Sequence, residues 1–497
     1  MTAVKRALIV TSLQRYIVLA INFTSLAVLS RLLTPAEIGV SIIGIGLVTI
    51  CQTLRDFGLV AYVINQIDGI EAKARSAFTV SIAIALALAA ALAALSAPIA
   101  EFYGDKAFKA YMLVAAVQLI AGTFYGPIAA LLQRDMNFSS LAVVEIAATA
   151  CGALVTIALA MSGTGALSVA WGGLVQSAVA GLLPLCFLPA FWVFRPSLAH
   201  WRDVVSFGAF TSLGFVLSRA YDLITASLYG RLLSLTALGL YNRSMMVCDL
   251  PMKGLLSGVV PIALPALAAE KREGRCIKSG LLNGFSLLTA VLWPALAVLA
   301  LFAGPVVAIV LGDQWSSASS FVPVIAASAA FSFPAFFTYP VLVLAGHVRQ
   351  TVTCQAVSLP LCVLIVFVAA HYGLEAVVWS LLLTVPLQNA TALYFIRRAV
   401  PFGWSELAAA LRSSALLTVA TALPAATAMV TLHALGASSL LAFPLGVAAA
   451  AAGWLAGLMI LDHPLSPHIR DAIGLVRKTV LQLRPAFNLP ADDRKSG

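Results

Sequence analysis

Nine ionisable residues interrupt long apolar stretches of this chain: Arg15, Arg55, Asp56, Glu145, Arg219, Asp222, Arg243, Asp249 and Lys253. Ionisable side chains are costly to place among lipid tails, so those that occur there are functional candidates by default. A guanidinium stays charged when buried and offers paired donors to phosphate or carboxylate oxygens. We therefore predict a binding site for an anionic ligand, built from the basic members Arg55, Arg219, Lys253, Arg243 and Arg15.

Three of the carboxylates, Asp222, Asp249 and Asp56, are candidates for coupling to H⁺ or Na⁺. All six histidines fall near or outside the ends of the apolar stretches, which argues against a histidine-based proton relay. The seven cysteines are scattered and form no cluster with histidine, so neither a metal site nor a cofactor is expected.

Several of these charges have a purely structural alternative. Arg219 and Asp222 lie three residues apart on one helical face and could neutralise each other. Arg55 and Asp56 are adjacent, so we expect their side chains to diverge and find partners elsewhere, or to mark a helix end. Glu145 could serve only to favour a nearby helix N-terminus.

The elements that must position these residues are membrane-spanning helices. Of the 497 residues, 61% are apolar and only 10% are charged, against roughly 25% charged in soluble domains. About 20 apolar residues span a bilayer as a helix. We count fourteen such stretches and predict an all-α integral membrane protein: 8–30, 38–64, 77–100, 110–132, 139–161, 166–192, 207–229, 238–266, 280–311, 320–345, 352–370, 373–396, 411–432 and 438–461. The first is read as a retained helix rather than a signal peptide.

The distribution of basic residues predicts the orientation. With alternating sides, 21 Lys and Arg residues fall on the side of the N-terminus and 4 on the other. Because cytoplasmic loops carry the excess of Lys and Arg, both termini are expected in the cytoplasm.

An internal repeat organises the chain. Arg31–Val40, of sequence RLLTPAEIGV, recurs as Arg231–Leu240, of sequence RLLSLTALGL, at an offset of 200 residues. Six predicted helices separate the copies, so both halves enter the membrane in the same sense. This predicts two six-helix lobes, 1–200 and 201–400, with a site between them, then two further helices in 401–465 and a cytoplasmic tail, 466–497. Arg31 and Arg231 themselves are expected to anchor at the outer interface.

The segments Ser30–Gly39, Leu54–Leu59 and Gly239–Arg243 resemble the polysaccharide-transport (Wzx-type) flippases of the multidrug/oligosaccharidyl-lipid/polysaccharide exporter superfamily. The resemblance implies movement of an undecaprenyl-diphosphate-linked oligosaccharide from the inner to the outer leaflet of the bacterial inner membrane. Implied partners are that lipid, membrane lipids, and a polymerase with its chain-length machinery, but no nucleic acid. Residues 231–235 depart from the acidic-plus-glycine loop usual in the family.

Sugar binding would need amide donors, and six are available in apolar stretches: Gln118, Gln176, Asn283, Gln355, Gln388 and Asn389. Two other transporters remain as alternatives, a drug exporter of the same superfamily and a flippase for the peptidoglycan lipid precursor. A polytopic glycosyltransferase or polymerase is a different class. It would need clustered acidic or histidine residues in a large loop, and the sequence shows none, so an enzyme is not expected.

The charge asymmetry predicts which loops face outward. In a cysteine-free variant, single cysteines at Ala36 and Gly163 should react with an impermeant thiol reagent in intact cells, whereas cysteines at Ser197 and Gly274 should not. Labelling on the opposite sides would overturn the assignment.

Overall fold

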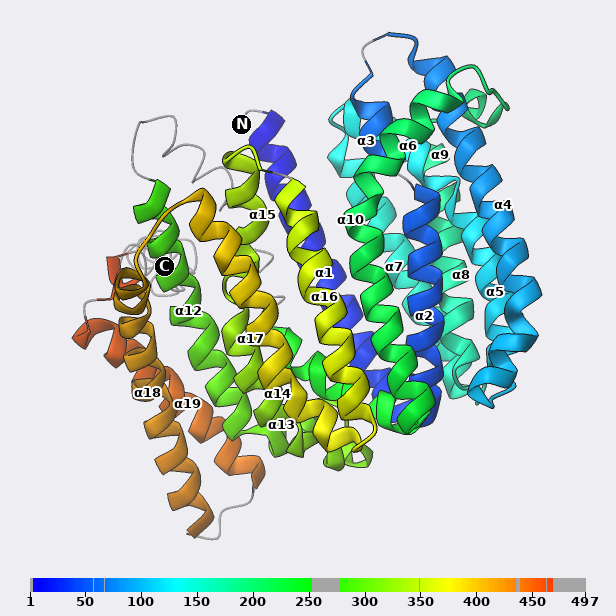
Figure 1. Cartoon of the computed structure of the whole chain (residues 1–497). Helices are drawn as coiled ribbons and strands as arrows, with labels where there is room; N and C mark the ends of the chain where they lie inside the picture. Colours follow the sequence, from blue (N-terminus) through cyan, green and yellow to red (C-terminus); the bar gives the residue numbers. More distant parts are fainter. Residues whose placement is uncertain are drawn as a thin grey trace, which may run out of the picture. The chain divides into compact units, whose positions relative to one another are not determined.

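The computed structural model describes residues 3–56, 58–66, 68–252, 277–347, 349–434, 439–461 and 463–467. Over these ranges the chain forms helices joined by short turns, and they contain no strand. Figure 1 shows the helices of the first 250 residues running side by side. The predicted all-α membrane fold is confirmed. Lys253 and most of the predicted C-terminal tail lie outside the described residues.

The helices follow one another with few residues between them. They are α1 (Ala3–Leu32), α2 (Pro35–Asp56), α3 (Leu59–Ile64), α4 (Ile70–Tyr103), α5 (Ala107–Gly122), α6 (Tyr125–Arg134), α7 (Phe138–Met161), α8 (Leu167–Leu182), α9 (Pro184–Phe187), η1 (Phe191–Phe194), α10 (Trp201–Leu228), η2 (Tyr229–Leu233), a helix over residues 235–252, α12 (Ile277–Leu301), α13 (Ala303–Val310), η3 (Asp313–Ser320), α14 (Val322–Ala329), η4 (Ala330–Ser332), α15 (Ala335–Leu344), α16 (Arg349–Ala370), α17 (Leu374–Ala399), α18 (Trp404–Ala434) and α19 (Ser439–Ile460).

Twelve helical stretches in the described residues are long and apolar enough to cross a membrane, so this is a multi-pass membrane protein. They correspond to twelve of the fourteen predicted spans. The other two are 207–229, which falls in α10 and η2, and 238–266, which runs beyond the described residues. The count of fourteen therefore stays a prediction.

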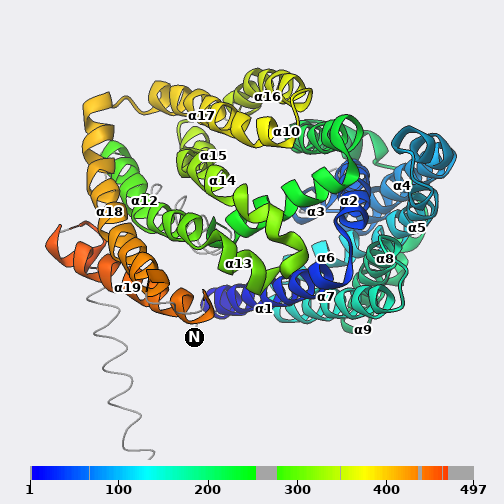
Figure 2. The ribbon, with the colours of Figure 1, turned by 90° about the horizontal axis from the view of Figure 1, so that it is seen from below.

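The chain divides into two compact units. The first combines Met1–Leu250 with Ala303–Ala399, and the second combines Pro251–Phe302 with Val400–Gly497. In the first unit α1 packs on α7, α7 on α8, α8 on α5 and α5 on α4, as Figure 2 shows from below. Its other helices include α10, which packs against both α2 and α16. The predicted lobes, 1–200 and 201–400, stay a prediction.

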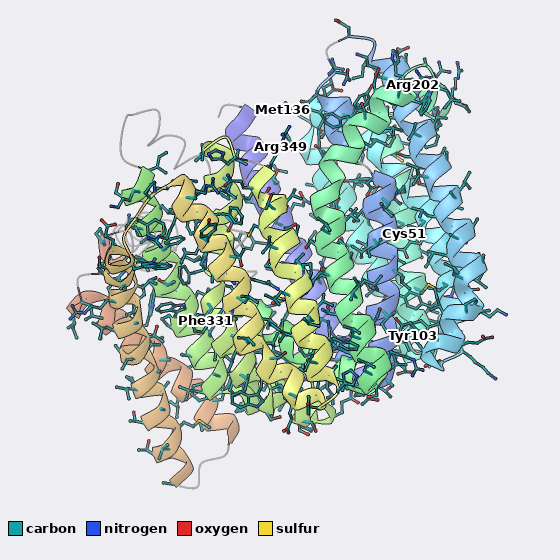
Figure 3. The ribbon with its side chains drawn as sticks, viewed as in Figure 1. Cys51, Tyr103, Met136, Arg202, Phe331 and Arg349 are labelled. Atoms are coloured by element: carbon teal, nitrogen blue, oxygen red, sulfur yellow. The ribbon has the colours of Figure 1, made fainter. Side chains whose placement is uncertain are left out.

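Two arginines from segments predicted to be cytoplasmic lie at the same end of the first unit. In Figure 3, Arg202, Met136 and Arg349 lie at one end, Tyr103 lies near the other, and Cys51 lies between the two levels. Arg202 and Arg349 belong to the segments predicted to be cytoplasmic. This places both on the same side of the first unit, as the alternation of spans requires.

The second unit is joined by a buried polar cluster between α12, α18 and the turn after α19. The Thr289 hydroxyl donates to Ser414 Oγ at 2.9 Å, and Ser414 donates to the carbonyl oxygen of Ser286 at 3.0 Å. His463 is 1% exposed, with its Nε2 3.2 Å from Ser286 Oγ and 3.3 Å from Ser414 Oγ. Such clusters hold apolar helices in register because an unpaired polar group would be costly there.

The turn also defines the tautomer of His463. The backbone N–H of Leu465 donates to Nδ1 at 3.1 Å, so Nδ1 is an acceptor and Nε2 carries the proton. A second proton on Nδ1 would face this N–H. Burial lowers the pKa of His463 below its ordinary value of 6.5.

Acid should therefore open this turn. The open state takes up a proton as pH falls through about 6.5, while the closed state stays neutral, so closure is fully favoured above that pH and lost as pH falls towards the lowered pKa. Amide exchange at His463, Leu465 and Ser466, corrected for intrinsic rates, should rise between about pH 7.5 and 5.5. His463→Gln should remove this pH dependence. Equal pH dependence in both proteins would contradict the prediction.

Candidate functional site

The first copy of the repeat forms a tight helix start. The Thr34 backbone N–H and hydroxyl both donate to Glu37 Oε2, at 2.8 and 2.9 Å, and the Glu37 N–H donates back to Thr34 Oγ1 at 3.4 Å. This is a capping box, and Pro35 occupies the first helical position, where its missing N–H costs nothing. The sequence Thr-Pro-Ala-Glu therefore fixes where α2 begins.

The second copy keeps half of this arrangement. Ser234 Oγ accepts a hydrogen bond from the backbone N–H of Ala237 at 3.0 Å, but no acidic residue follows three positions later to complete the box. The preceding segment, η2, is a π-helical turn that joins α10 to Ser234. The helix over 235–252 thus begins at the position equivalent to the start of α2.

The two copies meet in a reciprocal backbone contact. A Cβ atom added to Gly39 would clash with the carbonyl group of Leu235, lying 2.8 Å from its carbon. One added to Gly239 would clash with the carbonyl group of Pro35, lying 2.9 Å from its carbon. Pro35 and Leu235 are equivalent in the repeat, as are Gly39 and Gly239, so the contact has the self-complementary form of a twofold interface. We call these four residues the glycine gate.

Further contacts between the halves lie beside the glycine gate. Arg31 donates to the carbonyl oxygen of Ile309 at 2.7 Å, and the equivalent Arg231 lies over the ring of Phe102 at 5.4 Å. Each arginine thus contacts the other half of the repeat. The buried Trp315 donates to the carbonyl oxygen of Ser30 at 2.6 Å. This end of the interface is therefore closed in the structure.

Arg55 is held by backbone and by its neighbour. It is 6% exposed and donates to the carbonyl oxygen of Leu119 at 2.9 Å, in the last turn of α5. Gly122 leaves the space for its guanidinium, since an added Cβ there would lie 2.5 Å from Nη1. The expectation that Arg55 and Asp56 diverge was wrong. α2 ends at Asp56, and the long arginine side chain folds back to place Nη2 2.6 Å from Asp56 Oδ1.

Arg219 and Asp222 do face each other on α10, with Nη1 and Oδ2 3.4 Å apart. Both side chains remain open, at 50% and 57% exposed. On the same stretch, Leu223 packs against Gly46 of α2, and the Tyr221 hydroxyl accepts from Gln388 of α17. The pair is loose enough to exchange its partner for a ligand oxygen, because half-exposed ion pairs are worth only about 0–1 kcal/mol.

Arg243 is buried and forms no ion pair with a carboxylate of the described residues. It is 8% exposed, lies 5.8 Å from the ring centroid of Trp315, and has Nη1 3.1 Å from Met246 Sδ. Its Nε has no hydrogen-bond partner in the described part of the chain. A cation so placed is stabilised by the face of the indole ring, and it keeps unused donors.

The other predicted site residues are dispersed. Arg15 is exposed on α1, and Asp249 is half-buried on the helix over 235–252. Glu145 lies beyond the first turn of α7 and accepts from the Tyr125 hydroxyl at 2.8 Å, so it does not cap that helix. Across the described ranges, no hydrogen bond or ion pair joins Arg55, Arg219 and Arg243 to one another. The predicted binding and ion-coupling roles stay predictions.

A cavity of about 330 Å³ lies within the first 200 residues, between α1, α2, α5, α7 and α8. None of its lining residues is charged, and nine carry amide or hydroxyl groups: Asn22, Ser25, Thr49, Gln52, Tyr111, Gln118, Thr149, Thr156 and Gln176. Gln118 and Gln176 were among the amides singled out in the sequence. Asn22 and Gln52 were missed, although the Thr49–Gln52 spacing put two polar groups on one face of an apolar helix.

Membrane-spanning helices in which the two copies of a sequence repeat meet at a pseudo-twofold contact, with the buried arginines Arg55 and Arg243 in the same unit, have the architecture of a membrane transporter. The sequence model of the polysaccharide biosynthesis protein family matches residues 28–320. The chain belongs to this family.

Curated relatives and solved structures agree with that assignment. The chain is 24% identical to the teichuronic acid biosynthesis protein of Bacillus subtilis (strain 168), over 64% of this chain and 66% of the relative. It is 26% identical to the succinoglycan biosynthesis transport protein of Rhizobium meliloti (strain 1021), over 60% of each. The match thus spans slightly less than two thirds of these relatives. The fold is similar to that of a lipid II flippase in an inward closed conformation, with a TM-score of 0.70 and 11% identity over 94% of this chain and 99% of that one.

The glycine gate should tolerate no added side chain. Gly39→Ala and Gly239→Ala each place a methyl group against a carbonyl, at an expected cost of about 1–3 kcal/mol to the closed arrangement. Disulfide formation between cysteines at Pro35 and Leu235 should fall in both variants, as read from the mobility of the oxidised protein on gels. Gly304→Ala is the matched control, since a Cβ there meets nothing within 4 Å. Undiminished crosslinking in the two gate variants would show that the backbones are not in tight contact.

Proposed function

We propose that the protein moves an undecaprenyl-diphosphate-linked oligosaccharide from the inner to the outer leaflet of the bacterial inner membrane, for exopolysaccharide, capsule or O-antigen synthesis. The observation that carries the proposal is that the family match, 28–320, spans both copies of a repeat whose equivalent residues meet at the glycine gate. A polysaccharide family and a two-halved interface together favour transport of a glycan precursor across the membrane.

The charged groups support an anionic cargo. Arg219 is half-exposed beside a weak partner, and Arg243 retains a free donor, so both can offer hydrogen bonds to diphosphate oxygens. Arg55 already binds the Leu119 carbonyl oxygen and the Asp56 carboxylate, so we assign Arg55 a role in positioning α5. Asp222 would be released when the cargo takes its arginine, which makes it the strongest candidate for proton or Na⁺ coupling.

Alternating access between the halves would carry the cargo. The glycine gate closes the predicted outer side, so lobes 1–200 and 201–400 would separate there to release the glycan and close again around the inner opening. The prenyl tail would stay in lipid. Both termini would lie in the cytoplasm, and a polymerase with its chain-length machinery would consume the product at the outer leaflet. The activity is transport, with no covalent step.

A second candidate is a flippase for the peptidoglycan lipid precursor. The similarity in fold to the lipid II flippase over 94% of this chain favours it. Both cargoes would meet the same cations, so the phenotype of a deletion decides between them. Loss of a surface polysaccharide with normal growth supports the first candidate, and lysis supports the second.

Two arginines should give separable defects. Arg219→Ala should leave the protein inserted and folded but lower surface polysaccharide in a complemented deletion strain by about tenfold or more, because a charge-assisted hydrogen bond contributes about 1.5–3 kcal/mol. Arg55→Ala should instead lower the thermal stability and abundance of the protein. Arg349→Ala, which alters an exposed arginine on α16, is the control and should change neither. A fall in abundance alone for Arg219→Ala would favour a structural ion pair.

A further inference from the structure

The uncharged cavity lies between α1, α2, α5, α7 and α8 of the first unit, and its lining runs from near the ends of these helices, at Leu29 and Val169, to Gln52. Gln52 follows Cys51, which Figure 3 shows between the level of Arg202 and that of Tyr103. Of the amides that line the cavity, Asn22 and Gln176 are exposed and Gln52 and Gln118 are half-buried, so these groups are accessible from the cavity. None of these four amides makes a hydrogen bond to the described residues of the protein, so each has donors and an acceptor free for a ligand.

The rest of the lining keeps these amides available. The hydroxyl groups of Thr49 and Thr156 donate to the carbonyl oxygens of Ile45 and Gly152, at 2.7 and 2.8 Å, and so leave their lone pairs as acceptors. Gly173 leaves room for the Gln118 amide, since an added Cβ would lie 2.9 Å from Nε2. The cavity therefore presents amide donors and hydroxyl and amide acceptors that are open to a ligand.

The chemistry of the lining selects the ligand. A diphosphate would need cations, and none lines the cavity. A divalent metal would need carboxylates, and the described residues contain no cluster that could hold one. A neutral pyranose fits both requirements, because each hydroxyl donates and accepts and therefore matches amide and threonine groups. The volume of about 330 Å³ lies at the small end of ligand pockets, about 300–1,000 Å³.

We propose that this cavity, formed entirely within the first 200 residues, is a subsite for one or two neutral sugar residues. This inference rests on the proposed function and extends it. The protein would bind the cargo in two places, with arginines such as Arg219 binding the diphosphate and the amides of one half, the first 200 residues, binding the sugars. All lining residues come from that half, so the subsite moves as a body with it. Selection among glycans then depends on Gln52, Gln118, Gln176 and Asn22.

Binding of simple sugars to the purified full-length protein in nanodiscs tests the subsite. The probes are methyl glycosides of a hexose, a 6-deoxyhexose and an N-acetylhexosamine, observed by saturation-transfer NMR. At least one should bind in the millimolar range, and inorganic pyrophosphate should not displace it. Gln118→Leu and Gln176→Leu should each weaken binding about threefold to tenfold, the loss expected for one hydrogen bond. Gln133→Leu, on α6 outside the cavity, should leave binding unchanged.

The outcomes separate this inference from the proposed function. If none of the glycosides binds, or if all three variants bind alike, the subsite is wrong even when the deletion strain lacks surface polysaccharide. If pyrophosphate displaces the glycoside, the cavity binds the diphosphate, and the proposal of separate binding places for sugar and diphosphate is wrong. If a lipophilic cation such as tetraphenylphosphonium binds with Gln118 and Gln176 as determinants, the cavity serves a drug exporter, and both proposals fail.

Discussion

Within a bilayer every backbone polar group must be satisfied inside its own helix, and burying more apolar surface gives two helices little reason to associate. Close packing of small residues then decides how halves meet. In this protein the constraint acts at Gly39 and Gly239. Gly39 packs against the carbonyl group of Leu235, and Gly239 packs against the carbonyl group of Pro35, which is the equivalent residue in the other copy of the repeat. The start of α2, the start of the helix over 235–252 and the contacts of Arg31 and Arg231 are all arranged around this crossing.

The charged residues inside the helical bundle differ in how strongly other protein groups already bind them. Arg55 donates a hydrogen bond to the carbonyl oxygen of Leu119 in the last turn of α5, so this donor is not available to a ligand. Arg219 and Asp222 hold each other weakly in an open position, and Arg243 leans on an indole ring with a donor unused. In the second unit, the helices are joined by hydrogen bonds among uncharged side chains, those of Ser286, Ser414 and His463. Charge in this membrane protein therefore marks different tasks, and only the contacts of each residue separate them.

Much of the architecture could be predicted because hydropathy and repetition depend on sequence alone. The 200-residue offset paired Gly39 with Gly239. What could not be predicted was the facing of polar residues. Helices such as α7 and α8 are apolar on nearly every side, so periodicity does not indicate which face meets the protein interior. The pairing of Arg55 with Asp56 escaped for another reason: adjacent residues diverge within a helix, and the helix end at Asp56 was only an alternative.

A crossing built from main-chain atoms has a consequence for how such a protein can diversify. The Pro35 and Leu235 carbonyls are present whatever their side chains, and the glycines contribute only the lack of one. The amides of the cavity lie on other faces and other turns of the bundle. If the cavity binds sugars as proposed, exchange of Gln for Asn, Ser or Thr there would alter which hydroxyl pattern is accepted without changing the backbone contact at the glycine gate. Under the proposed subsite, one main-chain crossing would be compatible with different glycan specificities, set by a few side chains of the cavity.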